Sequence, residues 1–177
     1  MTNLERLLSQ YAAYHLDQKN IVTHFVGIPL IVFSILCLTA RAGVEISGVS
    51  VPLASILIVL SAIYYISLDK LFGILMLIIF IAAYPVAVNI ATLPMWSWLG
   101  ASIGIFVVGW VFQFVGHYFE KKKPAFVDDL IGLAIGPLFV FAEFVFLLGF
   151  RKPLHQRILK EAQMKRAEMD IKPQTAS

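Results

Sequence analysis

Five long apolar stretches, separated by short polar breaks, dominate the pattern along the chain. They cover residues 21–40, 51–68, 71–93, 96–116 and 130–150. A helix needs ~20 apolar residues to cross a bilayer, so each stretch is long enough to span. The break at Asp69-Lys70 is so short that it predicts a tight helical hairpin between the second and third stretches. The pattern therefore predicts an all-α, polytopic membrane bundle over residues 21–150, within one membrane domain covering residues 1–177.

The segments on either side of the bundle are more polar. In residues 1–20, leucines, Tyr11 and His15 recur at helical spacing, which predicts an amphipathic interfacial helix. This helix is expected to lie on the membrane surface or against the bundle. It lacks the basic start, apolar core and cleavage site of a signal peptide. Residues 151–177 form a basic tail, predicted to be helical as far as Lys172-Pro173.

The fifth stretch differs from the others because it contains Gly136-Pro137 and Glu143. Proline interrupts helical hydrogen bonding, and a carboxylate at membrane depth is costly. The stretch is therefore either a kinked span or a re-entrant segment. Four spans plus a re-entrant fifth place every lysine and arginine except Arg41 on one side, whereas five spans divide them almost evenly. Positive charge favours the cytoplasmic side, so we expect four spans and two cytoplasmic termini.

Composition agrees with a membrane location. Hydrophobic residues make up 59% of the 177, charged residues only 14%, and the mean hydropathy is +0.83. Soluble domains carry about 25% charged residues, so a soluble globular domain is excluded. The single cysteine, Cys37, allows neither an intrachain disulfide nor a cysteine-based zinc site. A lipid bilayer is the expected partner, and no nucleic acid is.

One group of candidate residues lies near the end of the fourth stretch. Gln113, His117 and Glu120 are spaced i, i+4 and i+7, so they share one helical face. Gly116 beside them allows a second helix to approach closely. The alternative is an interfacial histidine and a surface glutamate that balances the following lysines, residues 121–123.

A second group lies near the N-terminus. His15 and His24 are nine residues apart, so they are not neighbours on one straight helix. A break near Lys19-Asn20, with Asn20 as the N-cap of the first span, would fold the two histidines together. Ordinary interfacial polar residues are the alternative. His155, the fourth histidine, lies in the basic tail, where we expect it to be solvated.

Imidazoles plus a carboxylate suit iron(II) in oxygenases, and they do not exclude zinc. The candidate ligands are His15, His24, His117 and Glu120. A ligating histidine needs a partner for its other ring nitrogen. Candidates for that role are Tyr14, Asn20, Gln113 and Asp129. Glu143 is either a functional residue or an acceptor for backbone donors near Pro137. The loop at Lys123 either binds acidic lipid or a substrate carboxylate, or is only the positively charged flank on the cytoplasmic side.

These polar residues form two motifs. The first is His15-x4-Asn20-x3-His24 followed by Gly27-Ile-Pro-Leu30, and the second is Gln113-Phe-Val-Gly-His117-x-x-Glu120, followed by Lys-Pro124-Ala, Asp129-Leu and Gly136-Pro-Leu. Together they resemble the Mpo-type family of membrane 2-hydroxy fatty acid dioxygenases. The resemblance runs from about residue 4 to residue 154.

The resemblance implies an iron(II)-dependent dioxygenase that uses O2 to shorten a long-chain 2-hydroxy fatty acid by one carbon. It assigns metal binding to His15, His24 and His117, and to Glu120 either metal binding or support of a ligand. We expect the substrate to contact Asn20, Gln113 and Lys123, with supporting roles for Tyr14, Asp129 and Glu143. Bacterial inner membrane or endoplasmic reticulum is the expected location.

Two other functions fit parts of the pattern. A hydroxylase or desaturase would act on lipid through a metal, but the clustered histidine boxes of those enzymes do not occur in this chain. A small non-enzymatic transporter would use Glu143 and the broken fifth stretch as a transport path.

Overall fold

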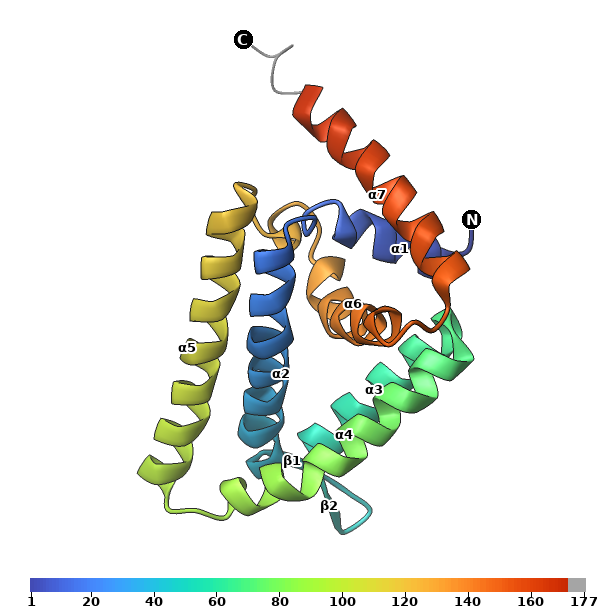
Figure 1. The fold of residues 1–177 in the computed structure, drawn as a ribbon. Coiled ribbons are helices and arrows are strands. Elements are labelled where there is room, and N and C mark those ends of the chain that lie inside the picture. Colours follow the sequence, from blue (N-terminus) through green and yellow to red (C-terminus); the bar gives the residue numbers. More distant parts are fainter. Residues whose placement is uncertain (172–177) are drawn as a thin grey trace. The chain divides into compact units, whose positions relative to one another are not determined.

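The computed structural model describes residues 1–171 and is helical almost throughout, which confirms the predicted all-helical class (Figure 1). The described residues divide into two compact units. A central unit comprises Val26–Phe112, and a terminal unit combines Met1–Phe25 with the residues from Gln113 onward. The seven α-helices are α1 (Asn3–Ala12), α2 (Gln18–Arg41), α3 (Leu53–Leu68), α4 (Lys70–Ala91), α5 (Met95–Glu120), α6 (Ile131–Leu147) and α7 (Lys152–Ile171).

The central unit contains the predicted helical hairpin, formed by α3 and α4 lying side by side (Figure 1). At its turn the carboxylate of Asp69 accepts a hydrogen bond of 3.0 Å from the backbone N–H of Phe72, which caps α4. Gly73 lets the backbones meet, because a Cβ there would clash with the backbone of Ile66. A capped turn and a small residue together explain why so short a break is sufficient.

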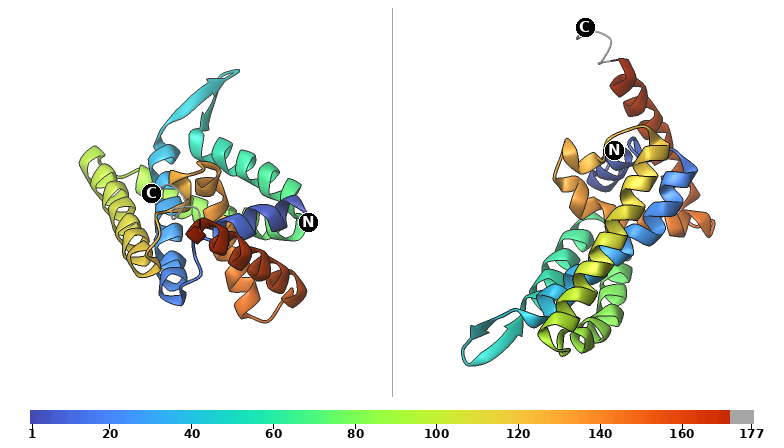
Figure 2. Two further views of the ribbon diagram at one scale, coloured as in Figure 1. Left: turned by 90° about the horizontal axis from the view of Figure 1, so that it is seen from above. Right: turned by 90° about the vertical axis from the view of Figure 1, so that its left-hand side faces the viewer.

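A two-stranded antiparallel hairpin joins α2 to α3, and the hydropathy pattern did not indicate it. Its strands are β1 (Gly43–Ile46) and β2 (Val49–Pro52), and Figure 2 shows it projecting beyond the helix ends. Ser47 and Gly48 form the turn with φ angles of 52° and 81°. Two consecutive positive φ values match the twist of a hairpin. The second apolar stretch therefore begins as a strand, and its helix starts only at Leu53.

The helices differ in whether they are long enough to span. By length and composition α2, α4 and α5 suffice to cross a membrane, whereas α3 and α6 have only 16 and 17 residues. A helix of 16 residues is about 24 Å long, less than the ~30 Å hydrocarbon core. Three long apolar helices support a membrane protein, and the number of spans stays a prediction.

In the terminal unit, α1 packs against α6 and α7 and buries its leucines between them. A capping box begins α1, since Thr2 Oγ1 accepts from the N–H of Glu5 and Glu5 accepts from the N–H of Thr2. Glu5 also accepts from Arg157 of α7 at 2.7 Å. The hydrogen bond from Thr2 and the Arg157 guanidinium lower the pKa of Glu5.

The fifth apolar stretch forms a single helix, α6, that continues through Pro137. It ends in a turn where Gly149 and Arg151 have φ angles of 85° and 53°. The predicted helical tail is confirmed as α7, and its expected end at Lys172-Pro173 lies outside the described residues. A short 3-10 turn, η1 (Ala125–Val127), precedes α6.

Candidate metal centre

Three histidines from distant parts of the sequence meet inside the terminal unit. His15 comes from the loop after α1, His24 from the first turns of α2, and His117 from the last turn of α5. Their potential ligand atoms all lie within 4.8 Å of one another. The side chains are 2%, 0% and 8% exposed, respectively. Three clustered, buried imidazoles are the donor set of a transition-metal site.

The break that brings His15 back to His24 lies earlier than the sequence indicated. α1 ends at Ala12, and the N–H of His15 donates to the carbonyl of Ala12 at 2.8 Å in a tight turn. α2 already begins at Gln18, with the carboxylate of Asp17 accepting from the N–H of Lys19 at 2.7 Å. The predicted break near Lys19-Asn20 and the N-cap role of Asn20 are therefore wrong. An aspartate three residues earlier accepts at the helix start, which leaves the Asn20 side chain free for other contacts.

Backbone carbonyls fix the tautomers of two of the three rings. Nδ1 of His15 lies 2.7 Å from the carbonyl of Tyr11, and Nδ1 of His24 lies 2.9 Å from the carbonyl of Asn20. A carbonyl only accepts, so each Nδ1 carries the proton and each Nε2 presents a lone pair. The two Nε2 atoms are 3.1 Å apart. Two facing lone pairs repel unless a cation lies between them.

This geometry fits a metal ion. Metal–nitrogen bonds of about 2.1 Å bring two ligand nitrogens to roughly the observed separation. Nδ1 of His117 is buried and has no hydrogen-bond partner among residues 1–171, which is expected of a ring that keeps a nitrogen for an ion. Burial, with His24 alongside, holds the pKa of His15 well below its usual value, so the ring is neutral and able to ligate.

The face of α5 that the spacing predicted Gln113, His117 and Glu120 to share is buried. Gln113, His117 and Glu120 are 6%, 8% and 5% exposed. Gly116 makes this possible, because a Cβ there would clash with the side chains of Thr23 and Asn20 on α2. Nε2 of Gln113 and Oδ1 of Asn20 are buried without a partner in the described part of the chain. The site therefore contains both a polar donor and a polar acceptor that are not in use.

Glu120 forms a hydrogen-bonded support for the histidine loop. Its Oε2 accepts from the N–H of Asp17 at 2.8 Å and from the side chain of Asn20 at 3.0 Å. Its Oε1 accepts from Arg166 of α7 at 2.7 Å, and the Glu120 side chain is 1% exposed. The alternative interpretation of Glu120 as a surface partner of the neighbouring lysines is wrong. Those lysines pair elsewhere, Lys122 with Asp170 and Lys123 with Asp128.

Arg166 is the site residue that the sequence did not reveal. Besides Glu120, it donates to the carbonyl of Ala13 at 2.8 Å, so it fastens the loop that carries His15. A signal was available, because a glutamate on a buried helical face requires a cationic partner. Nothing in the spacing indicated which of the many basic residues of the tail it would be.

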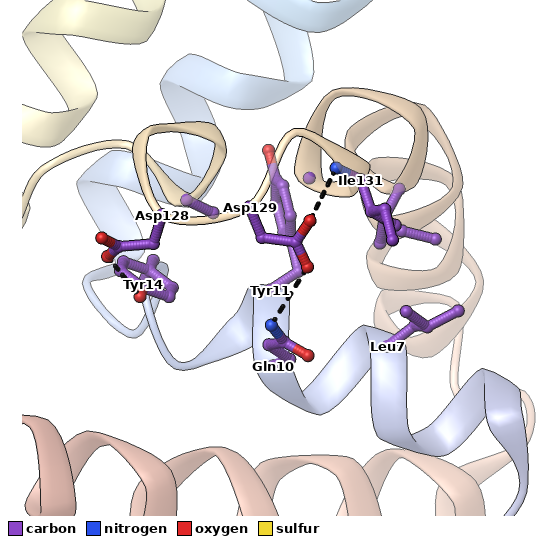
Figure 3. A pocket seen from close by; sticks show the side chains of 10 residues that line it. Leu7, Gln10, Tyr11, Tyr14, Asp128, Asp129 and Ile131 are labelled. Atoms are coloured by element: carbon purple, nitrogen blue, oxygen red, sulfur yellow. Dashed lines mark hydrogen bonds between the residues drawn. The ribbon is translucent and has the colours of Figure 1, made fainter.

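Tyr14 and Asp129 line a small cavity together with Tyr11 (Figure 3). Asp129 accepts from the N–H of Ile131 at 2.9 Å and from Gln10 at 3.4 Å. The hydroxyl of Tyr14 donates to Asp128 at 2.7 Å, and burial together with this carboxylate raises the pKa of Tyr14 to about 12. The cavity holds about 20 Å³, room for roughly one water.

Tyr11 also lines that cavity, and it connects these contacts to the cluster of His15, His24 and His117. Its ring stacks on His15 with centroids 4.1 Å apart and planes 5° apart. The segment around η1 therefore positions the His15 ring indirectly, through Tyr11. Tyr14 and Asp129 support this segment and do not contact the histidine nitrogens themselves.

A larger cavity of about 290 Å³ opens on the other side of His15. His155 and Glu143 also line it. The ring of His155 stacks on Phe146 with centroids 4.6 Å apart, and burial lowers the pKa of His155. His155 is therefore partly buried against an aromatic ring rather than fully solvated, as its position in the basic tail had suggested.

Comparison with known proteins bears on this arrangement. A protein-family model described as 2-hydroxy-palmitic acid dioxygenase Mpo1-like matches residues 1–148. The 2-hydroxy-palmitic acid dioxygenase MPO1 of Saccharomyces cerevisiae is 32% identical over 180 residues, which cover 98% of this chain and 98% of that protein. No solved structure matches the chain.

Proposed function

The chain belongs to the Mpo1-like family, and from that premise we propose that it is an iron(II)-dependent dioxygenase that shortens long-chain 2-hydroxy fatty acids by one carbon. The observation that carries the proposal is the cluster of His15, His24 and His117, with two Nε2 lone pairs facing each other at 3.1 Å. The relative is named for its action on 2-hydroxy-palmitic acid, and a dioxygenase needs a centre able to react with O2.

Iron(II) is the preferred ion for this site. Three neutral imidazoles bind zinc as readily, but zinc has no redox chemistry. When bound, iron(II) supplies the one-electron and dioxygen chemistry that amino-acid side chains lack. His15, His24 and His117 hold the ion, and the carbonyls of Tyr11 and Asn20 orient two of these rings.

The overall reaction balances with one O2 for each hydroxy acid. The bond between C1 and C2 breaks, C1 leaves as CO2, and C2 becomes the carboxyl carbon of the shorter acid. One water takes up the remaining oxygen and the two remaining hydrogens. The protein therefore needs to bind a carboxylate and a hydroxyl beside the metal and to exclude bulk water.

Two unpartnered polar atoms suit the head group of such a substrate. Nε2 of Gln113 offers a donor for an oxygen of the hydroxy acid, and Oδ1 of Asn20 offers an acceptor for its hydroxyl. Lys123, about half exposed and paired with Asp128, attracts the carboxylate at longer range rather than binding it directly.

Glu120 is assigned a positioning role, because its two oxygens already accept from Arg166, Asn20 and the N–H of Asp17. Tyr14 and Asp129 support the loop behind His15. Glu143 lines the larger cavity, the one that His15 also lines.

The membrane arrangement is part of the proposal. Four spans, an α6 that does not cross the membrane and an interfacial α1 form one domain with both termini in the cytoplasm, in a bacterial inner membrane or the endoplasmic reticulum. The support is charge, because this arrangement puts all lysines and arginines except Arg41 on one side. A C-terminal reporter that is active only in the cytoplasm tests it, and a silent reporter contradicts it.

The activity is tested with purified protein in three forms: iron-loaded under anaerobic conditions, zinc-loaded and metal-free. Each receives 2-hydroxypalmitate and O2, and mass spectrometry follows the acid one carbon shorter. We expect the product from the iron form alone. Equal product from the zinc form, or unchanged substrate with the iron form, contradicts the proposal.

A further inference from the structure

The larger cavity beside His15 is formed entirely within the terminal unit, by the end of α1, the start of α2, α6 and α7. Apart from His15, Gln18, Glu143 and His155, its lining is apolar. The apolar lining residues are Ala12, Leu16, Ile21, Val22, Phe25, Phe146, Leu147, Ile158 and Leu159.

The cavity has a closed part and an open rim. Ala12, His15 and Ile158 are 5%, 2% and 2% exposed, so they belong to its closed part, which includes one histidine of the candidate metal site. Val22, Leu147 and Leu159 are 61%, 71% and 40% exposed, so they form a rim of apolar side chains. In a membrane protein, an exposed apolar rim opens toward acyl chains rather than toward water.

We propose that this cavity binds the acyl chain of the 2-hydroxy acid, with the head group at His15 and the chain running toward the apolar rim. The inference rests on the proposed function and adds where the substrate chain lies. Only an amphiphile with a polar head and an apolar chain matches a cavity that begins at a metal-ligating histidine and continues between aliphatic and aromatic walls.

The volume sets how much of the chain is enclosed. The 290 Å³ cavity is about twice the ~150 Å³ apolar cavity that takes up one benzene, so it encloses roughly twelve carbon atoms. A palmitoyl chain exceeds that length, and its end passes the rim into the bilayer. For acids short enough to be fully enclosed, each methylene fewer therefore lowers the affinity about fourfold. For longer acids, each methylene beyond the rim changes the affinity little.

Ile158 of α7 is the wall residue best placed to set chain length. It is 2% exposed, and one turn before it His155 stacks on Phe146 of α6, which fixes this wall. α7 also lies beyond residues 1–148, the part that matches the family model. One wall of the proposed acyl-chain cavity is therefore supplied by a helix outside the matched region.

The test uses a series of 2-hydroxy acids with eight to eighteen carbons and the variants Ile158→Phe and Ile158→Ala. Ile158→Phe shortens the cavity, so we expect turnover of the long acids to fall more than tenfold and that of the eight-carbon acid less than twofold. Ile158→Ala shifts the preference toward longer chains. Leu60→Phe, at an exposed apolar position of α3 in the central unit, is the matched control and leaves the profile unchanged.

Leu159→Phe at the rim is the second variant, in case Ile158→Phe does not fold. A folded Ile158→Phe or Leu159→Phe protein with an unchanged chain-length profile overturns the inference.

Photocrosslinking separates this inference from the proposed function. A 2-hydroxy acid with a diazirine near carbon ten is bound to the metal-free protein, and the labelled residues are identified by mass spectrometry. Labels on Phe146, Ile158 or Leu159 support the cavity even if no product forms. Turnover by the iron form, with labels only on α3 and α4, overturns the cavity and leaves the proposed function standing.

Discussion

The two units of the chain treat polar side chains in opposite ways. Among the described residues, every buried polar or charged side chain lies in the terminal unit except Ser34 and Ser102. Ser34 satisfies itself locally by donating to the carbonyl of Ile31 at 2.7 Å. In the terminal unit some buried side chains also bond across the sequence, as Glu120 does to Asn20 and Arg166.

This difference agrees with the proposed placement of the site in the terminal unit. A membrane helix satisfies its own backbone, so apolar side chains alone are sufficient for the central unit. Burying imidazoles, a carboxylate and two amides costs free energy unless each finds a partner. In the terminal unit a network of hydrogen bonds orders Glu120 and the amide nitrogen of Asn20, whereas Gln113 Nε2 and His117 Nδ1 have no partner among the described residues.

The largest effects are expected from removing the histidines. His15→Ala, His24→Ala and His117→Ala each delete one of three ligands, so we expect bound iron and turnover to fall at least about 100-fold, beyond the 10–100-fold cost of losing an outer partner of a ligand. Metal analysis of the purified variants measures this. Ser34→Ala in the central unit is the control and retains the metal. Full iron content in all three histidine variants contradicts the assignment.

Arg166→Met is expected to have the next largest effect, because it leaves the Glu120 carboxylate buried and unpaired. Breaking such a pair costs about 3 kcal/mol, although removing both charges is often neutral. We therefore expect Arg166→Met to lower both thermal stability and iron affinity, and Glu120→Gln in the same protein to restore part of the stability.

The neighbouring Lys165→Ala serves as the control for Arg166→Met, since Lys165 forms a partly exposed ion pair with Glu161 of the same helix, at 3.6 Å. Equal behaviour of the Arg166→Met and Lys165→Ala proteins would show that the network does not hold the site.

Two glycines of α5 offer a matched pair across the two units. A Cβ at Gly116 would clash with Thr23 and Asn20, whereas at Gly104 nothing lies within 4 Å. We expect Gly116→Ala to destabilise by about 1–3 kcal/mol and to weaken iron binding, since overpacking displaces α2 and its histidine. Gly104→Ala gains helix propensity and is neutral or stabilising. Thermal unfolding in detergent distinguishes the two.

The smallest effect concerns the start of α1. The pKa of Glu5 is lowered in the folded state, so its contribution to stability is present above the usual value of 4.5 and is lost as the pH falls below it. We expect the protection of the α1 amides against hydrogen exchange, after correction for the intrinsic pH dependence of the exchange rate, to fall on acidification through this range. Glu5→Gln removes that dependence, and an unchanged profile in this variant would assign the effect to another group.

The sequence indicated the central unit well because hydropathy determines helix length and position there. The α3–α4 turn at Asp69 and the shared face of Gln113, His117 and Glu120 both followed from spacing. The β-hairpin was missed, since Ser47-Gly48 is a weak turn signal between apolar runs. Arg166 was missed because a pair 46 residues apart depends on how α7 packs, which periodicity does not encode.

The position of Arg166 late in the chain means that the loop carrying His15 is fastened only after the rest of the site has been synthesised. Synthesis produces His15 and His24 first, His117 much later and Arg166 last, so the ligands exist before the side chain that fastens their loop. A chain interrupted within α6 would carry all three histidines and an unpaired Glu120 in an apolar setting. Under the proposed function, full affinity for iron therefore requires a completed α7, because Arg166 holds both the Ala13 carbonyl and the Glu120 carboxylate.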